Sequence, residues 1–207
     1  MSRLKTEPRP VYDPLLRLLH AAIALSIISL IITSQLADWF EHGPYEDTLW
    51  NLHILSGYVL ATSLLTRLLW GLVGPASARW RDLWHPAVWK DSLKNLRLPA
   101  AHRVGHDPIA SLAYLFAYGV MALMVVTGLG LAASEFQAGP LAGWLGNATW
   151  LEDVLKDPHE AGFILMLGFI GLHMAALVFH HLRGERVAQS MLTGKQYIDA
   201  ESEVQHD

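Results

Sequence analysis

The chain has 207 residues, of which 52% are apolar, and it combines eight tryptophans with a formal net charge of −4. Its uncharged runs are longer than the core of a soluble domain of this size needs, which indicates an integral membrane protein surrounded by lipid, with no nucleic-acid partner. The chain contains no cysteine, which excludes disulfides, thiolate metal sites, iron–sulfur ligands and covalent haem attachment. Any redox cofactor must therefore be held by other ligands.

Four apolar runs, each near the ~20 residues that cross the hydrocarbon, predict four transmembrane helices. They cover residues 14–36, 49–72, 109–133 and 159–182. No small-x-small cleavage site follows the first run, so we expect it to stay as an anchor rather than to be removed as a signal peptide. The predicted fold class is all-α: an integral membrane four-helix bundle that forms one domain over residues 1–195, with a polar cytoplasmic tail at 196–207.

The distribution of charge orients this bundle. With both termini in the cytoplasm, the inner segments carry fourteen of the fifteen lysines and arginines, and only Lys156 lies outside. The outer segments then carry nine acids, which are Asp38, Glu41, Glu46, Asp47, Glu135, Glu152, Asp153, Asp157 and Glu160. Two interpretations of these acids stay open: solvation of exposed loops, or a docking face for a basic partner.

The two longest connections are expected to lie along the membrane surface. The inner one spans residues 74–108 and the outer one residues 134–158. Tryptophans and leucines in both are suited to anchor them at the interface, among them Trp84 on the inner side, and Trp144 and Trp150 on the outer side.

Four histidines match in pairs by their depth in the predicted spans. His159 and His173 are fourteen residues apart on one helix, which separates them by ~21 Å along the axis and leaves them within ~40° of the same face. His53 lies near the outer end of its span, level with His159. His20 lies near the inner end of its span, level with His173. The sequence thus predicts an outer pair, His53 and His159, and an inner pair, His20 and His173.

The imidazole pairs alone are compatible with zinc or copper, with a proton relay, or with an iron porphyrin held from both sides. A lone histidine near a helix end is more commonly an interfacial residue, but four depth-matched ones in lipid are a functional hypothesis. Nearby glycines open space for a porphyrin, although small residues also serve ordinary helix packing. These glycines are Gly57, Gly162, Gly168 and Gly171. Carboxylates, which a relay or a metal site normally adds, are almost absent from the spans, so haem with two histidine ligands is favoured.

Several runs of residues carry a resemblance to a known family. They are His53-Ile54-Leu55-Ser56-Gly57-Tyr58, Arg67-Leu68-Leu69-Trp70-Gly71-Leu72-Val73-Gly74-Pro75 followed by Ala78-Arg79-Trp80, Gly105-His106-Asp107-Pro108, and Met191-Leu192-Thr193-Gly194-Lys195. Together they resemble the bacterial di-haem cytochrome b family, which includes cytochrome b-561 and the cytochrome b subunits of membrane-bound nickel–iron hydrogenases. The similarity covers the chain from Tyr12 to about Lys195.

The resemblance implies an electron-transfer protein of the bacterial inner membrane. It implies two b haems, with His20, His53, His159 and His173 as axial ligands, and electron flow between a periplasmic partner and the quinone pool. The partner is a c-type cytochrome or a nickel–iron hydrogenase. The residues Pro158-His159-Glu160 and Leu172-His173-Met174 are more similar to family members that pair with a c-type cytochrome. Whether the subunit itself acts as a quinone reductase stays open.

Other polar residues near the inner ends of the spans have two interpretations each. Arg17 and Arg67 serve positive-inside anchoring or bind the propionates of the inner haem. His180 and His181 are expected at the inner interface and are reserve ligands. His106 is a surface residue or a proton donor to quinone.

A function of a different class is also considered. The chain would then be a non-redox membrane module, either a metal-ion transporter or a subunit that only anchors an enzyme. An α-band after chemical reduction separates the two classes, because only bound haem produces it.

Overall fold

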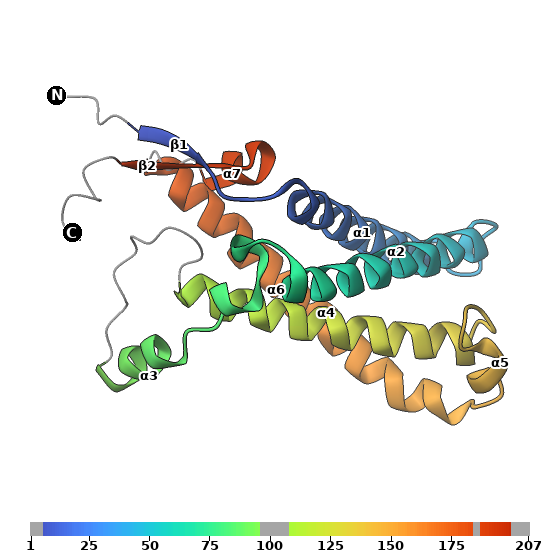
Figure 1. Ribbon diagram of the computed structural model, residues 1–207. Helices are drawn as coiled ribbons and strands as arrows, with labels where there is room; N and C mark the ends of the chain where they lie inside the picture. Colours follow the sequence, from blue (N-terminus) through green and yellow to red (C-terminus); the bar gives the residue numbers. More distant parts are fainter. Residues whose placement is uncertain (1–5, 96–107, 184–186, 200–207) are drawn as a thin grey trace. The chain divides into compact units, whose positions relative to one another are not determined.

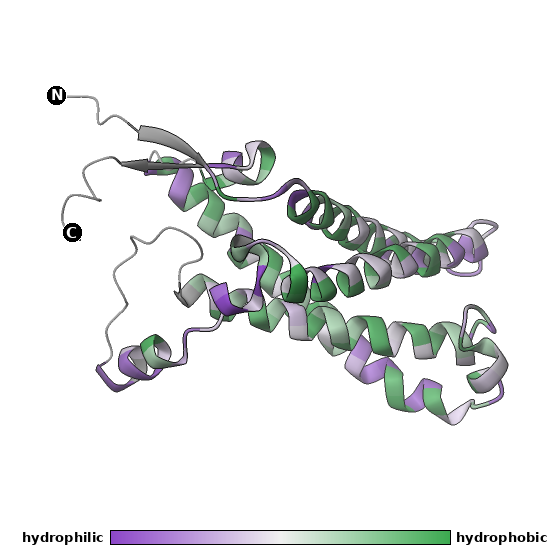
Figure 2. Ribbon diagram, in the orientation of Figure 1, coloured by the Kyte–Doolittle hydropathy of each residue, from purple (hydrophilic) through white to green (hydrophobic). Residues whose placement is uncertain are grey.

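The computed structural model describes residues 6–95, 108–183 and 187–199 (Figure 1). Four of its helices are long and apolar enough to cross a membrane: α1 Pro14–Trp39, α2 Glu46–Val73, α4 Pro108–Ser134 and α6 Trp150–Leu182. Hydrophobic residues run along these helices, and hydrophilic ones gather in the connections and in the short helix α3 (Figure 2). The prediction of a helical membrane protein with four spans is confirmed.

The helix starts follow from local chemistry. Pro14 opens α1 and Pro108 opens α4, positions where the missing N–H of proline costs nothing. Asp13 caps α1, because its Oδ1 accepts from the Leu16 N–H at 3.0 Å. Acids occupy the first turn of α2, where they complement the helix dipole.

The start of α6 differs from the sequence-based expectation. We predicted the fourth span over residues 159–182 and an outer connection over residues 134–158, but α6 begins at Trp150 and Pro158 lies inside it. Membrane helices tolerate an internal proline when other groups satisfy the backbone groups it frees. The end of the outer connection, residues 150–158, is therefore helix, and His159 is preceded by more than two helical turns.

The remaining elements are short. They are β1 Thr6–Pro10, the 3-10 helices η1 Ala76–Ala78 and η2 Trp80–Asp82, α3 Pro86–Asn95, α5 Ala142–Leu145, α7 Val187–Thr193 and β2 Lys195–Asp199. The two strands pair antiparallel, with Thr6 opposite Asp199, and are an addition to the predicted all-α fold. Because β2 reaches Asp199, the beginning of the predicted polar tail is ordered as a strand, and residues 200–207 lie outside the described ranges.

The chain divides into two compact units. Unit 1 comprises residues 1–18, 68–116 and 169–207, and unit 2 comprises residues 19–67 and 117–168. Unit 1 thus contains both chain ends, and unit 2 contains the greater part of α1, α2 and α4 together with the first half of α6.

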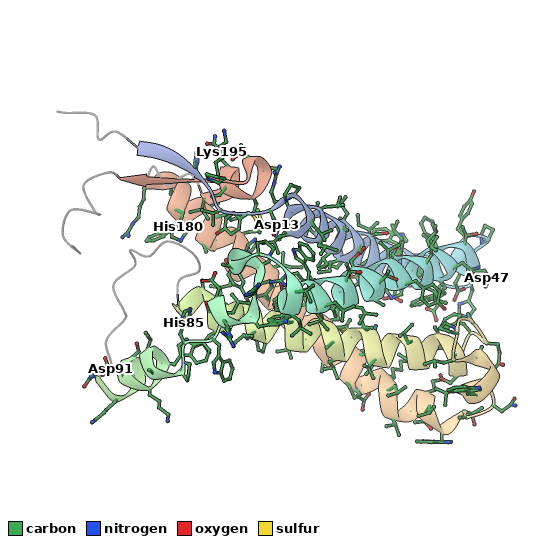
Figure 3. All side chains as sticks on the ribbon, in the orientation of Figure 1. Asp13, Asp47, His85, Asp91, His180 and Lys195 are labelled. Atoms are coloured by element: carbon green, nitrogen blue, oxygen red, sulfur yellow. The ribbon has the colours of Figure 1, made fainter. Side chains whose placement is uncertain are left out.

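Contacts between the two chain ends dominate unit 1. Strands β1 and β2 lie side by side, with α7 next to them (Figure 1). Gly194 ends α7 with a φ of +78°, a conformation that favours glycine, and its carbonyl accepts from the N–H groups of Val11 and Tyr12 at 2.9 and 3.1 Å. Asp13 and Lys195, both labelled in Figure 3, flank this junction. Since both ends of the described chain meet here, they lie on the same side of the membrane, as an even number of spans requires.

In unit 2, neighbouring helices approach through small residues. The hydroxyls of Ser29 on α1 and Ser56 on α2 are 2.7 Å apart. A Cβ on Gly162 of α6 would overlap the sulfur of Met124 on α4, so the methionine side chain packs against the space that this glycine leaves. These contacts fix the rotation of the helices that carry the candidate site.

Candidate functional site

Unit 2 brings the predicted outer pair together. His53 lies on α2 and His159 on α6, and both side chains are partly buried. Both residues belong to unit 2. Their role as ligands stays a prediction, but their placement in one unit is what such a role requires.

The imidazole of His53 is held from α1. Its Nδ1 lies 3.1 Å from the Leu30 carbonyl oxygen and 3.2 Å from the Thr33 hydroxyl. A carbonyl only accepts, so Nδ1 carries the proton and donates. Nε2 then keeps its lone pair, which is the state in which a neutral imidazole binds a metal.

The imidazole of His159 is held from α4 in the same way. Its Nδ1 lies 2.8 Å from the hydroxyl of Thr127. The Thr127 hydroxyl donates to the Leu123 carbonyl at 2.7 Å, so it accepts from the imidazole. His159 therefore also presents an unprotonated Nε2.

Glycine leaves room for one of these rings. A Cβ on Gly128 of α4 would lie 3.1 Å from Cε1 of His159, which is closer than ordinary van der Waals contact. Beside the other ring, a Cβ on Gly57 would meet only Leu30 Cδ2, at 4.0 Å. The predicted Gly57 lies one turn from His53, and a side chain there would make only an ordinary van der Waals contact, so its role at the site stays a prediction.

Aromatic side chains border the site. The Trp50 ring meets the His53 ring edge-on, with centroids 5.6 Å apart, and also contacts the Phe136 ring at 5.7 Å. Sequence reasoning named neither of these aromatic side chains, nor Thr33, Thr127 and Gly128, because the partners of a ring follow from helix rotation, which the sequence does not reveal.

The predicted inner pair falls in two different units. His20 belongs to unit 2 and His173 to unit 1, so their pairing stays a prediction. Within unit 1, the His173 ring stacks on Phe169, with centroids 5.8 Å apart and planes inclined by 16°. The reserve ligand His180, labelled in Figure 3, meets the Phe179 ring edge-on at 5.9 Å. His106 lies outside the described residues.

The two predicted arginines differ in their surroundings. Arg17 donates from Nε to the Met191 carbonyl at 2.9 Å and from Nη2 to the Leu192 carbonyl, and so binds the end of α7. Arg67 is only 3% exposed, and its guanidinium lies 5.6 Å from the ring centre of Tyr118 and hydrogen-bonds to that side chain. The structure thus gives Arg17 a structural contact, whereas Arg67 places a cation in the interior of unit 2.

The donor set fits haem. Among the described residues, no three histidine, cysteine, aspartate or glutamate side chains cluster as a metal site would need. The outer pair offers two imidazoles, and haem iron requires only two protein ligands because the porphyrin provides the other four. Membrane-spanning helices with such a pair between them are typical of a membrane-bound cytochrome with non-covalently held haem.

Comparison with known proteins agrees with this class. The chain belongs to the prokaryotic cytochrome b561 family, which it matches over residues 11–194. It is therefore a haem-binding electron-transfer protein of the membrane, and the alternative of a non-redox module is not supported.

Three relatives carry informative names. The chain is 28% identical to a probable Ni/Fe-hydrogenase B-type cytochrome subunit of Azotobacter chroococcum, over 79% of this chain and 78% of the relative. It is 29% identical to a protein of the same name from Bradyrhizobium diazoefficiens, over 90% and 85%. A probable Ni/Fe-hydrogenase 1 B-type cytochrome subunit of Escherichia coli is 34% identical over 42% and 40%. No solved structure matches the chain.

Proposed function

We propose that this chain is the two-haem membrane subunit that connects a periplasmic nickel–iron hydrogenase to the quinone pool. The observation that carries the proposal is the outer pair, in which two imidazoles of one unit each have Nδ1 engaged and Nε2 available. The hydrogenase is the favoured partner because the relatives named above are B-type cytochrome subunits of such enzymes.

His53 and His159 hold the haem nearer the periplasm, and His20 and His173 hold the one nearer the cytoplasm. When bound, the two haems supply one-electron transfer across the membrane. With two imidazoles to hold each haem, the chain would leave no place at the iron for oxygen or other small ligands. The protein residues therefore set the distance, orientation and potential of the redox groups and form no bonds with a substrate.

Arg67 is the proposed cation for a haem propionate. Its burial at 3% exposure makes the guanidinium costly in the interior unless anions compensate it, and a guanidinium binds a carboxylate with two parallel hydrogen bonds. The carboxylate would add to the contact with Tyr118. Arg17 is a weaker candidate for the same role, since α7 carbonyls already occupy two of its nitrogens.

The orientation follows from charge. Fourteen of fifteen lysines and arginines lie on the side of the termini, so we propose that both termini are cytoplasmic and that the protein spans the bacterial inner membrane. The quinone would then exchange electrons and protons near the inner surface.

A c-type cytochrome is the second candidate partner. The nine acids of the outer segments oppose a single lysine, which suits a basic, transiently bound protein better than a permanent subunit. The response of electron entry to salt separates the two partners.

The test of the cofactor is optical and stoichiometric. Purified protein reduced with dithionite should develop the α-band of b haem, and a pyridine haemochrome assay should give two haems per chain. A ratio near one would remove one of the two pairs, and the absence of any α-band would refute the proposal.

A further inference from the structure

We propose that Thr33 and Thr127 are the positioning residues of the outer site, each fixing the ring orientation and tautomer of the histidine that faces it. The inference rests on the proposed function, since it assigns these threonines to a haem-binding pair. It goes beyond the ligands themselves, because neither threonine would touch the iron.

The two helix pairs repeat one arrangement. Between α1 and α2, the Thr33 hydroxyl hydrogen-bonds to the carbonyl four residues before it at 2.7 Å, and approaches the carbonyl three before it at 3.2 Å. That latter carbonyl, of Leu30, also accepts from His53 Nδ1. The imidazole is thus held by a hydroxyl and a carbonyl from a single helical turn.

Between α4 and α6 the same set recurs. The Thr127 hydroxyl donates to the carbonyl four residues before it at 2.7 Å, with the carbonyl three before it, that of Met124, at 3.3 Å. The Nδ1 of His159 lies 2.8 Å from this hydroxyl. Because the two threonines make the same hydrogen bonds to their own helices and the same contact with an imidazole Nδ1, they orient the two rings in the same way.

The direction of these hydrogen bonds is determined by counting protons. A threonine hydroxyl has one proton, and in both cases a helix carbonyl takes it. Toward the imidazole the oxygen can only accept, so Nδ1–H donates and Nε2 is left for the iron. Such outer partners raise the basicity of a ligating imidazole and fix its plane.

Back-bonding of this kind is by itself ordinary in a membrane helix. Thr62 on α2 donates to the Tyr58 carbonyl at 2.8 Å, and its side chain is exposed. It therefore has the chemistry of Thr33 and Thr127 without their position, and offers a matched control on the same helix as His53.

The experiment uses the full-length protein, purified with its haems, in four variants: Thr33→Val, Thr127→Val, Thr33→Ser and Thr62→Val. Valine keeps the shape of threonine and removes the hydroxyl. We expect Thr33→Val and Thr127→Val each to shift the potential of one haem in the positive direction, because a less basic imidazole stabilises ferric iron less, and to weaken retention of that haem roughly 10-fold. Thr33→Ser and Thr62→Val should match the wild type.

The outcomes are distinguishable. The role of the threonines would be overturned if Thr33→Val and Thr127→Val had the same haem potentials and haem retention as Thr62→Val. The two-haem function would remain intact in that case. The role would also be overturned if Thr33→Val lost both haems and Thr33→Ser lost them too. Thr33 would then be needed for folding rather than for the orientation of one imidazole. A wild-type protein without haem would refute the proposed function together with this inference.

Discussion

A methyl group added to α4 beside His159 is expected to disturb the outer site alone. In Gly128→Ala, the new Cβ would lie 3.1 Å from His159 Cε1 and 3.7 Å from Nδ1. Carbon atoms pack best at about 3.5–4.0 Å, so the ring must move by roughly 0.4 Å or turn away from its rotamer, at a cost of about 0.5–1.5 kcal/mol. The movement also lengthens the 2.8 Å contact between Nδ1 and the Thr127 hydroxyl.

The expected result is a roughly 10-fold weaker retention of one haem, equivalent to about 1.4 kcal/mol, because loss of an outer partner of a ligating histidine has effects of this size. The assay is haem transfer to an excess of apo-myoglobin, followed optically, together with a redox titration. One haem should leave faster and the other should keep its rate and potential.

Gly119 provides the matched control on the same helix. A Cβ there meets nothing within 4 Å, so Gly119→Ala should leave both haems unchanged and stabilise α4 by up to about 1 kcal/mol through helix propensity. Equal haem retention in Gly128→Ala and Gly119→Ala would refute the reasoning, since it would mean that the His159 ring does not need the space that glycine leaves.

Three further changes test other parts of the proposal. Replacing either histidine of the outer pair by alanine should remove one haem, and replacing either histidine of the inner pair the other; the same spectral loss from all four variants would contradict the pairing. Electron entry from a c-type cytochrome should slow as salt rises and when Glu152, Asp153 and Asp157 are changed to lysine, whereas entry from a bound hydrogenase should hardly respond. Burial and nearby Glu152 raise the pKa of Glu135, so the native state loses stability as that carboxyl ionises with rising pH. Glu135→Gln should therefore gain thermal stability over the wild type at pH 7 but not at pH 4, and no difference in this gain between the two pH values would contradict the sign.

Sequence periodicity and length were sufficient for the four membrane helices, because the bilayer imposes a hydrophobic run near 20 residues whatever the tertiary contacts. They were insufficient at the start of α6. Pro158 follows a polar stretch that includes Glu152 and Asp153, and that pattern is also typical of a loop before a helix. Only packing decides that residues 150–158 continue the helix outward.

Part of the candidate site could also be predicted from the sequence, and part could not. His53 and His159 could be matched in depth, because rise per residue is constant in a helix. Thr33 and Thr127 could not be selected, since each is one of several hydroxyls in the spans, and Thr62 and Thr66 make the same bond to their own helix. What distinguishes a positioning threonine is the rotation of its helix toward an imidazole, which depends on contacts such as Ser29 with Ser56.

The repeated hydrogen bond between a threonine hydroxyl and an imidazole has a physical rationale in the membrane. An imidazole N–H in hydrocarbon must find an acceptor, and a carboxylate, the common choice in soluble metal sites, is expensive to bury in lipid. Helix carbonyls already accept from the backbone but have a second lone pair, and a back-bonded hydroxyl adds another acceptor without charge. Leu30 and Thr33 supply this neutral combination to His53, and Thr127 supplies a neutral acceptor to His159. Two histidines can thus be oriented as ligands in spans that contain almost no acids.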